Sequence, residues 1–443
     1  NMTTKITEQN VSSLANIGVS WQAVVVADGS TTLTTAAGKG YFINTTSATQ
    51  SVVLPAAASS SMGDTIVIKD YARTFATNNI TVASNTLDGV ASTTMSFSTN
   101  GQSLIFVFTD ATKGWTLVND DTVGKLGPTY IAATGGTVTE TGNFKVHTFT
   151  GDGNFVVSSL GQNVPSDQAN KVEYVVVAGG GGGGGGQHVH VAGGGGAGGY
   201  RESKGTIHGP YTVSPLGSGV DGITVTAGPT TYPITVGGGG NGGADGGTQG
   251  STGSNSVFST ITSTGGGGGG AEGDGSNPQR PGGSGGSGGG GSSQAAGTGG
   301  AGNTPPVSPP QGNAGGNSTD APPDFRGGGG GGATAAGGTG TPSPHTQGAG
   351  GAGATNHITG SPVIRAGGGG AGGTTSAPAS VGGVAGPGGG GAGGAGPSTV
   401  GGAGTANTGG GGGAPGSGPN PSPDKAGGNG GKGVVIIRYK FQS

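Results

Sequence analysis

His188 and His190 are the only residues of this chain whose spacing is typical of metal binding, with one residue between two imidazoles. Histidine is the commonest protein ligand of transition metals. The pair directly follows the glycine run Gly179–Gly186, and this setting favours an exposed or packing role for both side chains. We therefore assign no cofactor, and a metal role stays open for this pair alone.

Acid–base chemistry is the second possibility, because a glycosidase can be built from two suitably spaced carboxylates. Glu272, Asp274, Asp320 and Asp324 lie in segments that read as loops, and nothing in the sequence fixes a distance between them. No serine lies in a nucleophile elbow that leads from a strand into a helix. The chain contains no cysteine, which removes thiol catalysis. We expect a protein that is not an enzyme.

Side chains suited to molecular contact concentrate in the segments between the glycine runs. Proline stiffens such loops and lowers the entropy lost on binding, while arginine and aromatic residues commonly anchor contacts. The segments are 277–281, 303–310, 320–326, 342–347, 356–358 and 414–425. Within them we select as receptor-contact candidates Arg280, Asp320, Asp324, Phe325, Arg326, Asn420, Asp424 and Lys425. About half of these segments must lie at the end of the glycine runs that is attached to the rest of the protein. We expect those segments to be spacers.

A glycine array must position these loops. Only 16 of the 114 glycines precede Gly179, and the array ends at Gly433. The glycines form about eleven clusters, several with a triplet habit such as Gly282-Gly283-Ser284-Gly285-Gly286-Ser287. Three residues per turn is the period of the polyproline II conformation. A flexible low-complexity linker is the alternative interpretation of such a composition.

A glycine helix of this type makes no hydrogen bonds within itself, so its N–H and C=O groups need partners in adjacent helices or in water. Glycine lets the backbones approach closely enough to bond. Because ordering glycine costs more backbone entropy than ordering other residues, the bonds must form cooperatively across a lattice. We predict a polyglycine II bundle with a backbone interior and with loops at alternate ends.

Composition excludes several classes of protein. Only 8% of the residues are charged and the formal net charge is −3, so there is no basic surface for nucleic acid and no polybasic membrane patch. No apolar stretch approaches the twenty residues of a membrane span. The hydrophobic content of 29% is too low for a large oily core in the glycine-rich half.

Short runs rich in Val, Ile, Thr and Phe predict an all-β fold with almost no α-helix. We expect a leader at 1–20 with a short helix over Thr7–Ile17, a β-rich module at 21–123, and a linker at 124–128. A β-sandwich scaffold at 129–178 precedes the bundle at 179–433, and residues 434–443 supply its closing strand. Within the scaffold, 144–150 and 154–158 read as a hairpin around Gly151-Asp152-Gly153.

The framing strands carry a resemblance. Phe144–Gly153, the run Glu173–Ala178 into polyglycine, Gly193–Arg201, and Gly433–Tyr439 resemble the glycine-rich domain of bacteriophage tail-fibre and tail-tip proteins over about residues 144–440. Residues 35–120 resemble β modules of phage fibres less specifically. The resemblance implies a polyglycine II bundle whose tip loops touch a bacterial receptor, and it implies a homotrimer.

We therefore expect a structural and host-recognition component of a phage tail fibre or tail tip, located in the virion and acting outside the host cell. Its partners would be a bacterial surface polysaccharide or outer-membrane protein and other tail proteins, without nucleic acid or membrane insertion. Because residues 21–121 have a modest apolar content, we expect three chains to share that core. A purely structural fibre or coat subunit is the alternative, and an ice-binding protein is a further one.

Overall fold

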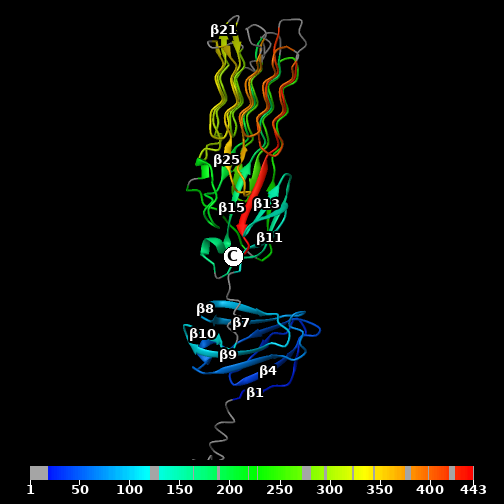
Figure 1. Cartoon of the computed structure of the whole chain (residues 1–443), viewed down its shortest axis with the longest axis vertical. Coiled ribbons are helices and arrows are strands. Elements are labelled where there is room, and N and C mark those ends of the chain that lie inside the picture. Colours follow the sequence, from blue (N-terminus) through cyan, green and yellow to red (C-terminus); the bar gives the residue numbers. More distant parts are fainter. Residues whose placement is uncertain are drawn as a thin grey trace, which may run out of the picture. The chain divides into compact units, whose positions relative to one another are not determined.

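The computed structural model describes residues 18–119, 129–162, 164–186, 190–217, 219–226, 228–271, 281–293, 297–321, 324–342, 345–374, 381–397, 399–418 and 425–442. The expected helix over Thr7–Ile17 and the expected linker lie outside the described residues. The chain divides into two compact units, Asn1–Gly127 and Pro128–Ser443. The described fold is almost entirely β, as the sequence predicts (Figure 1).

The first unit is built on one ten-stranded sheet in its described part. Its strands run in the order β1-β4-β6-β9-β10-β7-β5-β3, with β2 also paired to β4 and β8 to β7. The bounds are β1 Ser20–Trp21, β2 Val25–Val26, β3 Leu33–Thr34, β4 Lys39–Asn44, β5 Gln50–Val53, β6 Thr65–Asp70, β7 Ile80–Leu87, β8 Val90–Phe97, β9 Ser103–Asp110 and β10 Gly114–Leu117, with a 3-10 turn at Ala57–Ser59.

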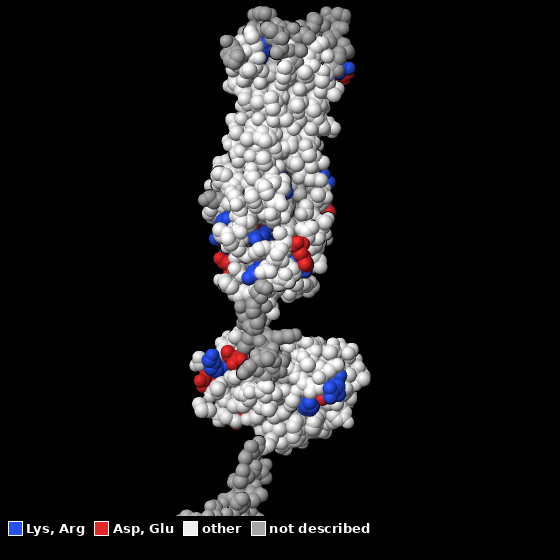
Figure 2. Space-filling model, viewed as in Figure 1, with Lys and Arg blue, Asp and Glu red and all other residues white. Residues whose placement is uncertain are grey.

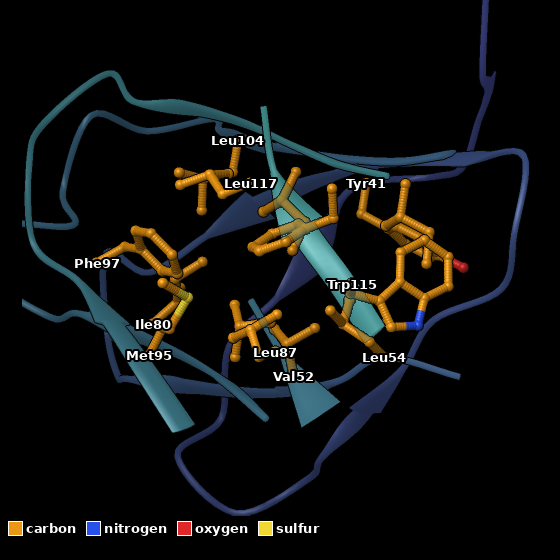
Figure 3. Close-up of a cluster of buried hydrophobic side chains, with 14 of the residues drawn as sticks. Tyr41, Val52, Leu54, Ile80, Leu87, Met95, Phe97, Leu104, Trp115 and Leu117 are labelled. Atoms are coloured by element: carbon orange, nitrogen blue, oxygen red, sulfur yellow. The ribbon is translucent and has the colours of Figure 1, made fainter. Parts of the chain in front are cut away.

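The core of the first unit is filled by side chains of one chain (Figure 3). The strands alternate buried and partly exposed residues, as in the pattern of Thr65–Asp70, which directs Ile66 and Ile68 inward. Trp115 is 1% exposed and its indole N–H donates to the carbonyl of Pro55 at 2.9 Å. The expectation that three chains share this core stays a prediction.

The second unit begins with two sheets that pack as a sandwich. One has the order β11-β14-β18-β19-β20 and the other β12-β13-β27-β15-β16, with β17 paired to β15. The bounds are β11 Ala132–Thr134, β12 Thr137–Thr141, β13 Phe144–Phe149, β14 Gly153–Ser159, β15 Lys171–Val177, β16 Tyr200–Glu202, β17 Ile223–Thr224, β18 Thr230–Thr235, β19 Ser256–Phe258, β20 Ile261–Ser263 and β27 Val434–Lys440, with helix α2 at Ser166–Asn170 and a 3-10 turn at Pro215–Gly217.

Strands β15 and β27 are adjacent and antiparallel, with Val175 opposite Ile436. The sequence prediction that the strands entering and leaving the array share one scaffold is therefore confirmed. Alternate residues of both strands face the other sheet, including Tyr174 and Ile437, while Val175 and Ile436 join a second core against the base of the bundle. Both faces of these strands are buried, which explains their continuous runs of apolar residues.

The predicted hairpin around Gly151-Asp152-Gly153 is wrong. β13 pairs with β12 and β27, whereas β14 pairs with β11 and β18 in the other sheet. The connection crosses between sheets because Phe149 and Phe155 both bury their rings in the core that lies between them. Asp152 accepts a hydrogen bond from the N–H of Val236 at 2.8 Å and so fixes the crossing.

The glycine array is a polyglycine II bundle that rises from this sandwich (Figure 1). Residues 178–186 show its bonding, because successive N–H groups donate to three different runs and the pattern then repeats. Gly180, Gly181 and Gly182 donate to the carbonyls of Gly431, Gly196 and Ser251 at 2.9, 2.8 and 2.9 Å. Gly183, Gly184 and Gly185 donate to the same three runs through Gly428, Gly193 and Thr248 at 2.9, 3.0 and 2.8 Å.

Three further runs surround the same segment and donate to it. The carbonyls of Gly179, Gly180 and Gly181 accept from the N–H groups of Gly266, Gly240 and Gly412 at 2.9, 2.8 and 2.9 Å. The central run therefore donates to three antiparallel neighbours and accepts from three parallel ones. A Cβ on Gly183 would lie 2.1 Å from the carbonyl oxygen of Gly413, so the lattice has no room for side chains inside.

Some glycine clusters contain a reversal, so the sequence count of about eleven clusters is not a count of the runs. Gly283 is bonded to Gly268 and Gly286 to Gly265, and Gly289 then donates back to Gly283 at 2.9 Å. The cluster Gly282–Gly291 thus descends and ascends again. Glycine and serine suit a tight turn and a run equally well, which is why composition alone does not separate the two.

Candidate functional site at the distal end of the bundle

Short hairpins and loops close the bundle at both ends. The hairpin of β21 (Thr319–Ala321) and β22 (Asp324–Arg326) lies at the end far from the sandwich, as Figure 1 shows, while β25 (Ala354–Asn356) lies near the sandwich. β23 (Thr341–Pro342) pairs with β24 (His345–Thr346), and β25 pairs with β26 (Val363–Arg365). Opposite ends of one rigid lattice therefore carry two separate sets of side chains.

The loops at the base are fixed to the sandwich. In the segment after Gly302, Gln311 accepts from Tyr200 N–H at 2.8 Å through its backbone and from Thr264 N–H at 2.8 Å through its side chain. The Asn356 side chain donates to the buried carboxylate of Glu202. The candidate segments 303–310 and 356–358 therefore belong to the base, where they hold the bundle to its scaffold.

Hydroxyl side chains close the ends of the glycine runs at the distal end. Ser293 accepts a bond from Val191 N–H at 2.8 Å, Ser318 donates to the carbonyl of Ser292 at 2.6 Å, and Ser417 donates to the carbonyl of His190 at 2.7 Å. A run end without such partners would leave backbone groups unpaired. These serines make the distal end ordered enough to hold larger side chains in place.

Asp320 and Phe325 face each other in register on the distal hairpin. Asp320 is exposed. Phe325 is partly buried because the ring of His190 packs edge-on against it, with ring centroids 4.6 Å apart. The structure thus brings together two of the contact candidates, Asp320 and Phe325, and the histidine considered for metal binding, His190. The His190 ring packs against Phe325.

Arg326 is 1% exposed. That burial argues against its selection as a contact residue, because a receptor cannot reach a guanidinium inside the bundle end. The next residue, Gly327, donates its N–H to the Gln347 side chain at 3.0 Å, and the Gln347 amide lies 3.4 Å from the carbonyl of Phe325. The Gln347 side chain therefore holds the hairpin on its inner side, and Asp320 and Phe325 form its outward surface.

The other selected residues are spread over positions that the structure describes in part. Lys425 is partly buried, and its carbonyl accepts from Gly186 N–H at 3.0 Å. For Asp324 only the backbone is described, in β22. Arg280, Asn420, Asp424 and His188 lie outside the described residues. Among the described residues no group of three or more His, Cys, Asp or Glu could hold a metal ion.

A groove of about 430 Å³ opens between the β23–β24 hairpin and the run at 381–386. Val381 and Val384 form one wall and are 63% and 70% exposed. His345, Thr346 and Gln347 line the other wall. Since Gln347 also bonds to the Phe325 hairpin, the groove and that hairpin belong to one connected surface, which we call the distal surface.

Sequence reasoning missed this groove. The signal was present, because Val381 and Val384 are three residues apart in a glycine run, and a period of three places both on one side of a polyglycine II helix. Two exposed valines beside hydroxyl, amide and imidazole groups can bind a ligand with both apolar and hydrogen-bonding parts. Figure 2 shows that Lys, Arg, Asp and Glu gather on the sandwich and are nearly absent from the bundle shaft on the visible face.

The second unit is thus a backbone lattice inserted between two strands of a sandwich, with larger side chains at its far end. The chain belongs to the glycine-rich domain family, whose model matches residues 156–440. No curated protein matches the chain. In the described part of the chain, no helix is long and apolar enough to cross a membrane.

Proposed function

We propose that this protein is a non-enzymatic structural and host-recognition component of a phage tail fibre or tail tip. The bundle presents the distal surface to a bacterial receptor, either a polysaccharide or an outer-membrane protein. The protein acts in the virion, outside the host cell, together with other tail proteins and without nucleic acid or membrane insertion.

The location of the side chains carries this proposal. Inside the lattice a side chain has no room, so only the ends and the perimeter of the bundle are free to vary for recognition. The base is occupied by bonds to the sandwich, such as Asn356 to Glu202. The distal surface is left with an exposed carboxylate at Asp320 and the exposed valines of the groove, a mixture suited to specific contact.

Binding of the purified protein to a panel of bacterial cells tests the proposal. The decisive variants are Phe325→Ala and the double change Val381→Ser with Val384→Ser. The matched control is Val400→Ser, since Val400 is 59% exposed but does not line the groove. We expect at least tenfold weaker binding for both distal variants, unchanged binding for the control, and unchanged thermal unfolding for all three.

A purely structural fibre or coat subunit makes the opposite prediction. Such a subunit would bind no cell of the panel, or would bind equally well with the distal surface altered, and it would self-associate through the bundle. Either result would reject host recognition by the distal surface. An equal loss of binding in Val400→Ser would also count against host recognition by the distal surface. It would show that any change on the perimeter of the bundle weakens binding.

We further propose that the protein forms a homotrimer through the first unit, and that exposed aromatic side chains on its outside take part in the contact. Trp21 stacks on Phe42 with ring centroids 4.3 Å apart, and Tyr71 packs edge-on against Phe42 at 6.3 Å. Trp21 and Tyr71 remain 46% and 57% exposed. Mass measurement of the full chain at micromolar concentration is expected to give three copies, and the double change Trp21→Ser with Tyr71→Ser is expected to give one. A monomer for the unaltered chain would reject the trimer.

A further inference from the structure

The first unit contains a trough that the proposed function does not use. Its volume is about 630 Å³, within the range of about 300–1,000 Å³ typical of ligand sites. It lies across β3, β5, β7 and β8, on the side of the sheet opposite the core. Its end wall is the segment at Pro55 and Ala56, which is fixed by the bond from the Trp115 indole to the Pro55 carbonyl.

The floor and rims of the trough follow from the strand register. Thr34 lies opposite Val53, Val53 opposite Ala83, and Ala83 opposite Thr94, so four strands contribute one row of outward side chains. The two middle members are apolar and the two outer members carry hydroxyls. The row therefore forms an apolar floor with a hydrogen-bonding rim on each side.

The polar groups of the trough are available to a ligand. Within the described part of the chain, the side chains of Thr34, Asn85, Ser92 and Thr94 make no hydrogen bond to the protein. Each hydroxyl can donate and accept, and the Asn85 amide can do both as well. None of the described residues that line the trough is Asp, Glu, Lys, Arg or His. An ionic ligand would find no partner for its charge here.

The backbone is distorted at the same place. The β7–β8 ladder pairs Ser84 with Thr93 and Thr86 with Ala91, but it has no pair between Asn85 and Ser92. Ser92 has φ of +48°, a left-handed conformation that is unfavourable for residues other than glycine. Strained backbone of this type gathers at binding sites, where the surrounding structure maintains it. The distortion falls on two of the groups that line the trough.

We propose that this trough binds a neutral saccharide chain. Sugar rings offer apolar C–H faces, which fit the floor of Val53 and Ala83, and hydroxyls at their edges, which can both donate to and accept from Thr34, Thr94 and Asn85. The absence of charge from the lining selects neutral over acidic sugars. This site lies in the first unit and is independent of the distal surface.

Calorimetric titration of the full chain tests the proposal. The probes are neutral hexasaccharides of α-1,4-glucose, β-1,4-glucose and β-1,4-N-acetylglucosamine, with hexagalacturonate as the anionic comparison. We expect one or more neutral probes to bind and the anionic probe not to bind. The double change Thr34→Val with Thr94→Val, which keeps the shape and removes two hydroxyls, is expected to weaken binding at least fivefold.

Two further variants make the result decisive. Ala83→Leu fills the floor and is expected to abolish binding, whereas Thr99→Val removes an exposed hydroxyl outside the trough and is expected to change nothing. Val381→Ser with Val384→Ser is expected to leave saccharide binding intact, which separates this site from the distal surface. The proposal is overturned if no neutral probe binds, if the anionic probe binds as well as the neutral ones, or if the threonine variant binds unchanged.

Discussion

Glu173, on the strand that leads into the glycine bundle, and Arg438, on the strand that returns from it, form an ion pair with Nη1 2.5 Å from Oε2. The two residues are directly opposite in the β15–β27 ladder, and both side chains are buried. The guanidinium also lies over the ring of Phe144, 3.7 Å from its centroid. The pair therefore joins the two ends of the inserted bundle at a point protected from solvent.

Replacement of Arg438 by Met is expected to destabilise the second unit by about 3–5 kcal/mol, because the buried carboxylate loses its partner. Burial already raises the pKa of Glu173 against the opposing effect of Arg438. The double variant Glu173→Gln with Arg438→Met is expected to regain much of the loss. Urea unfolding followed by far-ultraviolet circular dichroism measures both effects.

Trp21 and Trp115, the two tryptophans of the chain, lie in the first unit, so indole fluorescence supplies an internal control. The indole transition is expected to stay in place while the transition of the second unit moves. A double variant no more stable than Arg438→Met alone would show that the guanidinium acts through packing on Phe144 and not through the ion pair.

A single methyl group inside the lattice is expected to be disruptive. In Gly183→Ala the new Cβ would lie 2.1 Å from the Gly413 carbonyl oxygen, so two runs would have to separate and break their hydrogen bonds. Gly238→Ala is the matched control, because a Cβ there meets nothing within 4 Å. Differential scanning calorimetry is expected to show a large drop in the Tm of the second unit for the first variant and almost none for the second. Equal Tm values would refute the lattice described above.

Acidification is expected to weaken the second unit through His208, whose pKa burial lowers to about 4 from an ordinary value of 6.5. Its ring donates from Nε2 to the Lys171 carbonyl. Since the folded-state pKa is below the unfolded one, this stability is complete above pH 6.5 and is lost as the pH falls toward 4. At about 1.4 kcal/mol for each pKa unit, the contribution is about 3 kcal/mol.

The measurement is the urea midpoint of the second unit between pH 7.5 and 4. His208→Gln keeps a donor for the Lys171 carbonyl and removes the titration, so its midpoint is expected to fall less steeply than that of the unaltered protein. His147 contributes with the same sign, because burial lowers its pKa as well, and part of the slope is therefore expected to remain. Parallel slopes for the two proteins would exclude His208 as a cause.

Glu202 is expected to give the second unit the opposite pH dependence, with stability that falls as the pH rises. Burial raises its pKa, although Tyr200, Ser214 and Asn356 all donate hydrogen bonds to the carboxylate. Its contribution is complete below the unfolded pKa near 4.5 and is lost as the pH rises through the folded-state value. Glu202→Gln is therefore expected to match the unaltered protein at pH 4 and to exceed its stability at pH 8. A variant less stable at pH 8 would mean that the ionised carboxylate is the preferred partner of these donors.

The sequence predicted most reliably those elements whose local pattern matches their burial. Val172–Ala178 and Val434–Tyr439 read as buried strands and are paired in one sheet. The sequence pattern of β8 is weak because Ser, Thr and Ala fill most of its positions, although the Asp88-Gly89 turn before it is a strong hairpin signal. The hairpin prediction for β13 and β14 failed because a glycine turn does not show which sheet the next strand joins.

The candidate site depended on contacts that a single sequence does not contain. The exposure of Asp320 and the burial of Arg326 are decided by where the distal hairpin packs. That packing follows from the register of runs more than a hundred residues apart, as in the bond from Val191 to Ser293. The groove beside Val381 and Val384 could be predicted only by knowing that the β23–β24 hairpin lies next to their run. Periodicity predicted the local conformation of the runs, but the reversal inside Gly282–Gly291 changed which loops lie at which end.

The central run at 178–186 also constrains when the protein can fold. Among its six neighbours are residues 191–199, which are synthesised directly after it, and residues 425–433, which are synthesised much later. Its strand, β15, likewise waits for β27. During synthesis the ribosome therefore releases a long glycine-rich segment whose backbone groups stay bonded to water until the run at 425–433 and β27 have emerged. The bundle can close only after these residues have been synthesised, and a chain cut short before Lys425 would lose both the last run and the strand that seals the sheet.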